Sequence, residues 1–360
     1  MEGVAEDGIS RLLVFAKGNH GISEHALNKA IALFRKQADP LEKHNCLPLG
    51  NFKFNPKVNA FSFTGTAAQT RTLLWRFSFI LNLVDGFSNK HSFFQSQHFK
   101  CFSLLVKISS FVYSPCIFSF DVHDLKLLIH KYLEMTVQLY SPHNSRNATK
   151  SQIRVIKPKG HHMIHYPKLT FQSGPLRHSS TLCHERSMGK YKGAVHSKLN
   201  PTIQIAMSMR FQMLHYVNEQ FDCPSRIKNT LCDMSRYHFP NVQLPPKAIV
   251  HKTLRTQSML LAQGLAILKE VPSPLWLTRA SPPSFYRILL VYSLAGSVNI
   301  VIKSLQVIEF SRQFMAYKVV ESDVYENLNI KNLYLHKSFS VHEHNDSLYL
   351  FPDSLPYKEY

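Results

Sequence analysis

The sequence lacks the features that define secreted and membrane-spanning proteins. Its six cysteines form no C-x-x-C pair and no regular framework, which is typical of reduced thiols in the cytosol or nucleus. The N-terminus shows no basic segment followed by an apolar run. No window holds the about 18 uncharged apolar residues that a membrane helix needs. We therefore expect a nuclear or cytoplasmic protein that is neither secreted nor transmembrane.

Motifs that bind phosphate groups or activate a serine are also missing. Neither G-x-x-x-x-G-K-[ST] nor G-x-G-x-x-G occurs, and there is no G-x-S-x-G elbow. These absences disfavour a nucleotide-dependent enzyme and a serine hydrolase, and we expect no small-molecule substrate. Asp121 and Asp124 could offer carboxylates to a divalent ion. Their position just before an expected helix favours an N-cap role instead.

Acidic residues are scarce. The 23 Asp and Glu residues stand against 42 Lys and Arg residues, which gives a formal net charge of +19 with histidine neutral. Such an excess on a globular surface favours a polyanionic partner, nucleic acid first and an anionic membrane second. A basic protein without such a partner is the alternative. Because 44% of the chain is hydrophobic and 18% is charged, we expect a buried core.

The hydrophobic pattern predicts an α+β protein in four parts. They are a helical region over 1–150, an α+β block over 151–220, a proline-rich linker over 221–285 with one helix near 254–269, and a small β-rich unit over 286–360.

Particular elements follow from local signals. Two short helices are expected in residues 1–40, the second starting at Ser23, and further helices start at Thr66 and near Asp121. We expect a loop over 40–65 and poor order over 40–65 and 221–250. Strands are predicted over 287–292, 298–303, 305–310 and 316–320, with a turn at Gly296-Ser297.

The most specific signal is an ordered block in the middle of the chain. It comprises His161-His162-Met163-Ile164-His165-Tyr166-Pro167, then Gly174-Pro175, then Glu185, and then Lys190 and Lys192. Together with Cys183 and His184, its histidines are ligand types that zinc prefers. Because the chain has 20 histidines, and Pro158, Gly160 and Pro167 argue against a regular helix, we favour a structural role and predict no metal site.

This block resembles the last catalytic segment of CACTA/EnSpm-like DNA transposases and of the transposase-derived proteins of animal genomes. Two other segments resemble the same family in the expected order. Glu2-Gly3-Val4 is similar to the end of a D-x-M-H-D-x-x-E-G-V segment. Phe310-x-Arg312-x-Phe314-x-Ala316-Tyr317-x-Val319 is similar to an F-x-R-x-F-x-A-Y-x-V signature. The resemblance spans nearly the whole chain.

The resemblance implies an RNase H-like core in which two aspartates and one glutamate hold two divalent ions, Mg or Mn, for phosphodiester cleavage. Glu185 would be the third carboxylate, and the helices of 66–140 would belong to an insertion. The first aspartate has no counterpart, and the second would precede the first residue of this sequence. Where the family has a tryptophan and an Arg-Phe pair, this chain has Ser180, Cys183 and His184.

A single carboxylate cannot assemble a two-metal site. We therefore expect an incomplete RNase H-like core, truncated at the N-terminus, that no longer binds the ancestral metal ions and has lost transposase activity.

Three functions are left open. The first is a transposon-derived pseudoenzyme that retains DNA binding, with Lys190, Lys192, Lys198 and Arg210 as the candidate contacts. The second is a domesticated DNA- or chromatin-binding module that uses the C-terminal β unit. The third is a metal-dependent nuclease built from carboxylates such as Asp121 and Asp124. The sequence gives no indication of the oligomeric state.

Overall fold

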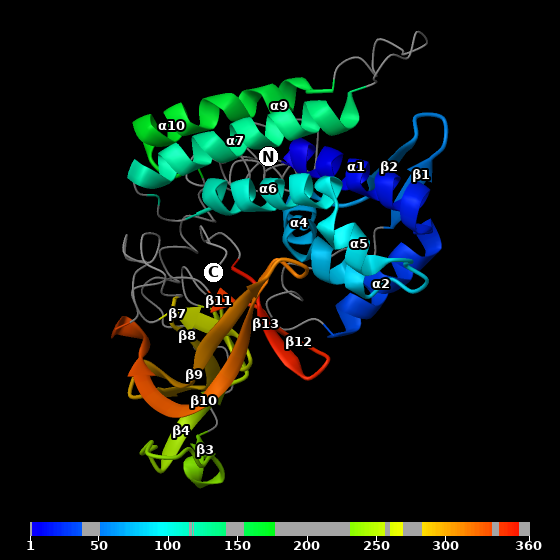
Figure 1. The fold of residues 1–360 in the computed structure, drawn as a ribbon. Helices are drawn as coiled ribbons and strands as arrows, with labels where there is room; N and C mark the ends of the chain where they lie inside the picture. Colours follow the sequence, from blue (N-terminus) through cyan, green and yellow to red (C-terminus); the bar gives the residue numbers. More distant parts are fainter. Residues whose placement is uncertain are drawn as a thin grey trace, which may run out of the picture.

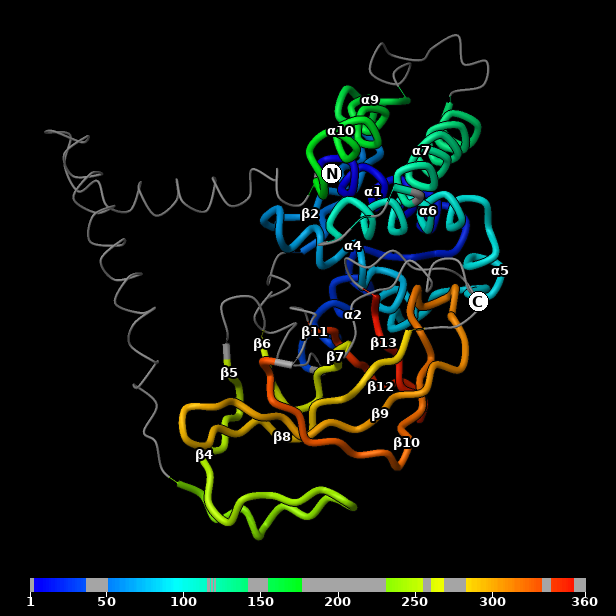
Figure 2. Tube along the Cα trace, turned by 90° about the vertical axis from the view of Figure 1, so that its left-hand side faces the viewer, coloured from blue at the N-terminus to red at the C-terminus, as the bar shows by residue number. Residues whose placement is uncertain are grey.

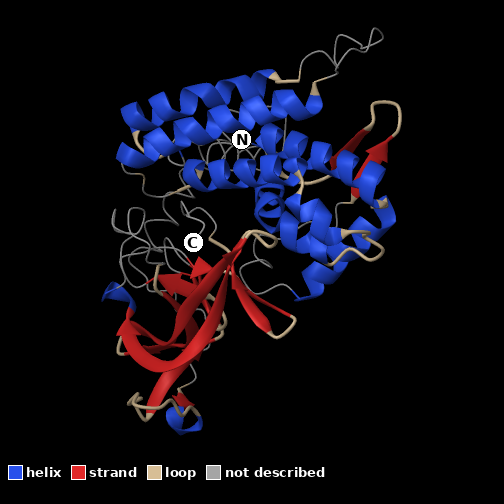
Figure 3. Ribbon diagram, viewed as in Figure 1, coloured by secondary structure: helices blue, strands red, loops and turns tan. Residues whose placement is uncertain are grey.

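The molecule combines a helical half with a β-sheet half. The computed structural model describes residues 2–37, 51–114, 117, 119–141, 155–176, 231–255, 260–268, 283–332 and 338–352. Within them, helices gather at one end of the molecule and antiparallel strands at the other (Figures 1 and 3). The α+β class expected from the sequence is confirmed. None of the described helices is long and apolar enough to cross a membrane.

The helical half begins with two helices, as predicted, and continues beyond residue 150. Its elements are α1 (Glu2–His20), α2 (Glu24–Gln37), α4 (Ala67–Asn82), α5 (Lys90–Gln95), α6 (Gln97–Val112), α7 (Ser119–Tyr140), α9 (Pro158–His162), the 3-10 turn η1 (Met163–His165) and α10 (Tyr166–Ser173). The segment from α9 to α10 packs on α7 and α1. The helical half therefore extends into the block that the sequence analysis assigned to 151–220.

Local signals fix where these helices start. The Ser23 hydroxyl accepts a hydrogen bond from the Ala26 amide at the start of α2. Thr66 and Gln69 form a capping box at the start of α4, which satisfies two amides that the helix leaves without partners. The expected N-cap role of Asp121 is wrong, because α7 already begins at Ser119. Asp121 lies instead in the first turn of α7, where a negative charge interacts favourably with the helix dipole.

A β-hairpin occupies part of the expected loop over 40–65. Strands β1 (Phe52–Asn55) and β2 (Ala60–Phe63) pair antiparallel, with Phe52 opposite Phe63. Phenylalanines alternate along both strands and bury one face of the hairpin, since Phe52, Phe61 and Phe63 are buried. The expectation of a loop without regular structure is therefore wrong for 52–63. Residues 38–50 lie outside the described part.

In the described residues, the β half consists of a curved nine-stranded antiparallel sheet and a separate two-stranded one (Figure 1). Its strand order is β11-β7-β8-β9-β10-β13-β12, and β4 pairs with β8 and β3, while β5 pairs separately with β6. The strands are β3 (Cys232–Asp233), β4 (Lys247–His251), β5 (Thr253–Arg255), β6 (Leu260–Ala262), β7 (Ala266–Leu268), β8 (Phe285–Leu294), β9 (Ser297–Ser311), β10 (Ala316–Asn329), β11 (Ser338–Phe339), β12 (Val341–His344) and β13 (Ser347–Leu350). The 3-10 turns are η3 (Met234–Arg236) and η4 (Ile330–Asn332).

Three sequence expectations for this half are corrected. The helix expected near 254–269 is replaced by β5, β6 and β7, because the apolar run over 260–268 turns at Gly264, whose φ is +90° and which a helix does not accommodate. Likewise, β3 and β4, at the two ends of 232–251, pair with each other, and β4 also pairs with β8, where poor order was expected. The strands expected over 298–303 and 305–310 are one strand, β9.

A single core joins the two halves. The largest cluster of buried residues includes Leu73 and Phe79 of α4 together with Phe314 and Leu350 of the β half. The Phe79 ring lies 5.7 Å from that of Phe314. Both views place the hairpin of β12 and β13 next to α2 and α4 (Figures 1 and 2). The sheet is thus held directly on the helices.

Candidate functional site

The residues predicted to carry function in the central block fall mostly outside the described part. Glu185, Lys190, Lys192, Lys198 and Arg210 all lie between 177 and 230, and so do Cys183 and His184. Their assigned roles stay predictions. Only the first section of the block, from His161 to Pro175, can be placed in the fold.

The three histidines of that section are exposed on one side of a broken helix. Pro158 and Pro167 each stand at the start of a short helix, where a missing amide hydrogen costs nothing. The His161 and His165 rings lie 5.6 Å apart. Among the described residues, no group of three or more His, Cys, Asp or Glu side chains is placed to hold a metal ion. Met163 faces inward and is fully buried.

The outer surface of this segment is basic. Residues 155–176 contain no acidic residue, and their six lysines and histidines are all exposed. We call these side chains the basic face: Lys157, Lys159, His161, His162, His165 and Lys168. The α9–α10 segment lies on α7 at the end of the molecule farthest from the sheet (Figure 1). The Phe171 side chain beside it is 77% exposed.

A groove of about 990 Å³ runs along the exposed side of α1 and reaches the basic face at Lys157. We call it the α1 groove. One wall is the β1–β2 hairpin, which contributes Phe54 and the turn residue Asn59. The opposite wall is formed by His98 of α6 and Tyr140 of α7.

A charged cluster fixes the end of the groove next to the basic face. The Asp7 carboxylate lies 2.8 Å from Arg11 and 2.6 Å from Lys157. Arg11 also donates to the Val155 carbonyl, and its guanidinium carbon lies 5.2 Å from the centre of the Tyr140 ring. Because the two cations surround Asp7, this carboxylate adds little negative potential to the groove. The cluster ties α1 to the chain that leads into α9.

The aromatic walls of the groove are uncharged at neutral pH. The His98 ring stacks on Phe15, with ring centres 3.7 Å apart, and burial lowers the pKa of His98. Burial likewise raises the pKa of Tyr140 far above its usual range. Both rings therefore present neutral π surfaces and polar edges to anything that enters the groove.

A smaller cavity of about 340 Å³ adjoins the groove between α1 and α7. Val4, Leu133 and Ile156 give it mainly apolar walls. Behind it, the buried Cys101 thiol lies 3.5 Å from the Thr136 hydroxyl. Burial raises the pKa of Cys101, so this thiol stays protonated and is a poor nucleophile.

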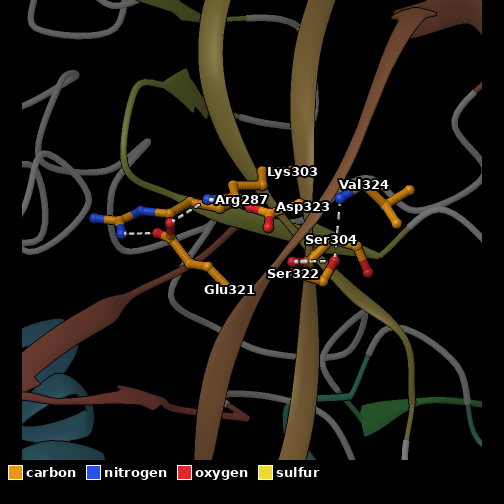
Figure 4. A network of polar contacts seen from close by, with 7 residues as sticks. All are labelled: Arg287, Lys303, Ser304, Glu321, Ser322, Asp323 and Val324. Atoms are coloured by element: carbon orange, nitrogen blue, oxygen red, sulfur yellow. Dashed lines mark hydrogen bonds and ion pairs between the residues drawn. The ribbon is translucent and has the colours of Figure 1, made fainter. Parts of the chain in front are cut away.

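The sheet has a charged cluster of its own, but its charges are paired (Figure 4). Glu321 of β10 contacts both Arg287 of β8 and Lys303 of β9. Burial raises the pKa of Glu321, but hydrogen bonds from the two cations outweigh that effect and the pKa is lowered overall. The cluster connects three neighbouring strands, and its geometry fits a structural role.

The fold and these surfaces define an α+β protein whose helical half presents a basic face beside the α1 groove. A scan against protein-family models found no match for this chain, and searches of curated proteins and of solved structures found none either.

Sequence reasoning did not identify the α1 groove. Ser10, Lys17 and other polar residues recur at helical spacing along α1, and that pattern indicates one solvent-facing side. The walls could not be inferred from it, because His98 and Tyr140 come from helices far along the chain. Lys157, Lys159 and Lys168 belong to the basic face, and sequence reasoning did not single them out. The lysines that it chose lie outside the described residues.

Proposed function

We propose that this chain is a transposase-derived protein that no longer cleaves DNA and that binds nucleic acid through its basic face. The proposed ancestry rests on the three ordered segments that resemble CACTA/EnSpm-like transposases. It includes an incomplete RNase H-like core interrupted by a helical insertion. Loss of cleavage is proposed because Ser180, Cys183 and His184 stand where the family has a tryptophan and an Arg-Phe pair, inside the block that resembles its last catalytic segment.

The acid-free stretch over 155–176 is the observation that carries the binding proposal. Its six lysine and histidine side chains are all exposed, and the α9–α10 segment that carries five of them lies at one end of the molecule (Figure 1), so a polyanion can contact several of them at once. The overall charge has the same bias. Residues 1–176 have 21 Lys and Arg against 10 Asp and Glu, whereas residues 231–360 have 13 against 10. Positive potential therefore concentrates on the helical half.

Two other functions are less well supported. A domesticated DNA- or chromatin-binding module that docks through the β unit would need free positive charge there, and the main cationic cluster of the sheet is paired with Glu321. A nuclease built on Asp121 and Asp124 would need both carboxylates in one open site. Asp121 is only 1% exposed while Asp124 is exposed, which does not fit an open two-metal arrangement.

The test is fluorescence anisotropy with a labelled DNA duplex, titrated across salt concentrations. We expect binding that weakens steeply with salt. The double variant Lys159→Gln/Lys168→Gln should lower affinity about 3- to 10-fold and reduce the salt slope by about 2, because each lysine-phosphate contact contributes about 1.

A matched double variant in the β half, Lys247→Gln/Lys331→Gln, removes the same charge from exposed positions and should have little effect. Equal losses in both double variants would show that only total charge matters. Absence of binding at low salt, in a sample with native circular dichroism, would rule out the proposal. Binding that survives excess unrelated competitor DNA would favour the domesticated module.

A further inference from the structure

The α1 groove follows its helix for most of the helix length. Its α1 lining extends from Gly3 to Asn19, which corresponds to about 24 Å at 1.5 Å per residue. The hairpin on one side and the α6–α7 wall on the other make it concave along this length. A groove of this size can hold an extended chain of several units.

The groove combines aromatic rings with uncharged hydrogen-bonding groups. Phe54 and Tyr140 contribute half-buried rings from opposite walls, and His98 lies beside Tyr140 with ring centres 5.4 Å apart. The exposed amide side chains of Asn19 and Asn59 also line it. Aromatic faces stack on nucleobases of any sequence, and amides can pair with base edges.

Cations stand at both ends of the groove. Lys17 is exposed, and its ammonium lies 3.1 Å from the centre of the Phe54 ring. Lys157 is at the other end, beside the basic face, and its side chain is 62% exposed. Glu6 is an exposed acid between them, and in the described part of the chain it forms no ion pair. The charge of Asp7 is already offset by Arg11 and Lys157.

From these features we propose that the α1 groove binds single-stranded nucleic acid, with bases against the aromatic and amide groups and phosphates at Lys17 and Lys157. The inference rests on the proposed function and names its substrate class. Base stacking requires unpaired bases, because the bases of a duplex are stacked on one another and turned away from a concave protein surface. The basic face then extends the same phosphate path beyond Lys157.

The experiment compares a labelled single strand with a duplex of the same length, using the full chain. Oligo-dT and oligo-U serve as the single strands, which separates DNA from RNA. We expect the single strand to bind about 10-fold more tightly than the duplex. Lys17→Gln should weaken single-strand binding about 3- to 10-fold and lower its salt slope by about 1.

Glu6→Gln is the matched variant, since it removes an opposite charge from the same exposed side of α1. It should strengthen single-strand binding by a similar factor, and neither variant should change duplex binding. These opposite signs could not arise from a general loss of folding. Poly-glutamate should compete poorly, because it offers negative charge without bases.

Three results would overturn the inference while leaving the proposed function intact. The first is a duplex that binds as tightly as the single strand. The second is a pair of groove variants that leave single-strand affinity unchanged while the basic-face double variant lowers it. The third is competition by poly-glutamate as strong as that by oligonucleotide. If neither nucleic acid binds at low salt, the proposed function itself fails.

Discussion

The turn between β8 and β9 holds an alanine in a conformation that alanine disfavours. Ala295 has a φ of +48° and Gly296 a φ of +78°, and they are the only two residues between the paired Leu294 and Ser297. Two positive φ angles define the turn type whose twist matches that of the flanking strands. Glycine suits this geometry, whereas the β-carbon of alanine crowds the neighbouring carbonyl. The hairpin therefore forms despite local strain at Ala295.

Replacing this alanine should stabilise the protein. We expect Ala295→Gly to raise the free energy of unfolding by about 0.5–1 kcal/mol, because the relief of left-handed strain exceeds the added entropy of the unfolded chain. Urea denaturation followed by circular dichroism measures the change. Gly296→Ala is the paired control and should destabilise by about 1 kcal/mol or more. A loss of stability in Ala295→Gly would contradict the assigned turn.

The F-x-R-x-F-x-A-Y-x-V motif spans the turn between β9 and β10, and its apolar residues have a structural explanation. Phe310, Phe314 and Tyr317 are buried, and Phe314 reaches across to Phe79 of the helical half. The apolar positions of the F-x-R-x-F-x-A-Y-x-V pattern therefore belong to the core shared by the two halves, and Phe314 contacts the helical half directly. Their spacing reflects packing, and none of them belongs to the proposed binding surfaces.

At the scale of elements, the β1–β2 hairpin depends on side chains of the helices beneath it. The Asn28 amide bonds both backbone groups of Phe52, donating to its carbonyl at 3.1 Å and accepting from its amide at 2.8 Å. The Ser10 hydroxyl accepts from the Phe61 amide. Side chains thus satisfy backbone groups that a lone two-stranded hairpin would leave to water. The position of one groove wall follows from these bonds.

Removing the Asn28 amide should loosen the hairpin. We expect Asn28→Ala to destabilise the protein by about 1–3 kcal/mol, since two half-buried backbone groups lose their partner. Amide hydrogen exchange should accelerate in β1 and β2. Asn55→Ala is a matched control, because the Asn55 side chain accepts a hydrogen bond from the exposed Lys57 amide in the turn; it should cost less than about 1 kcal/mol. Equal effects of the two variants would mean that Asn28 does not anchor the strand.

Some elements were predictable from sequence because their signals are local. The caps at Ser23 and Thr66 required only neighbouring residues, and so did the apolar run Ile288–Tyr292 in β8. The hairpin over 52–63 was missed because Pro56 suggested a loop, although it lies in the turn between two strands. The apolar run over 260–268 was predicted as a helix. Its strands could not be recognised locally, because they pair with distant residues, such as Phe285 opposite Leu268. The groove was unpredictable for the same reason, since its walls meet only in the folded chain.

At the scale of the whole molecule, Phe79 connects helices and sheet. Its ring is 1% exposed and lies within 6 Å, centre to centre, of five other rings: Phe34, Phe314, His342, His344 and Phe351. Next to it on α4, the buried Arg76 bonds the Ser340 hydroxyl at 3.1 Å and lies 4.2 Å from the Phe351 ring centre. With one core shared between the halves, neither should unfold alone.

Phe79→Ala tests this coupling. The cavity should lower the free energy of unfolding by about 3–5 kcal/mol, and helical circular dichroism and hydrogen exchange in β10 and β13 should report the same shifted transition. Phe171→Ala removes an equally large ring from a side chain that is 77% exposed, so it should change stability by no more than about 0.5 kcal/mol. Two separate transitions, with only the helical one shifted in Phe79→Ala, would mean that the halves are independent domains. In that case nucleic-acid binding would have to be measured on the helical half alone, because the groove and the basic face would then no longer depend on the sheet for their arrangement.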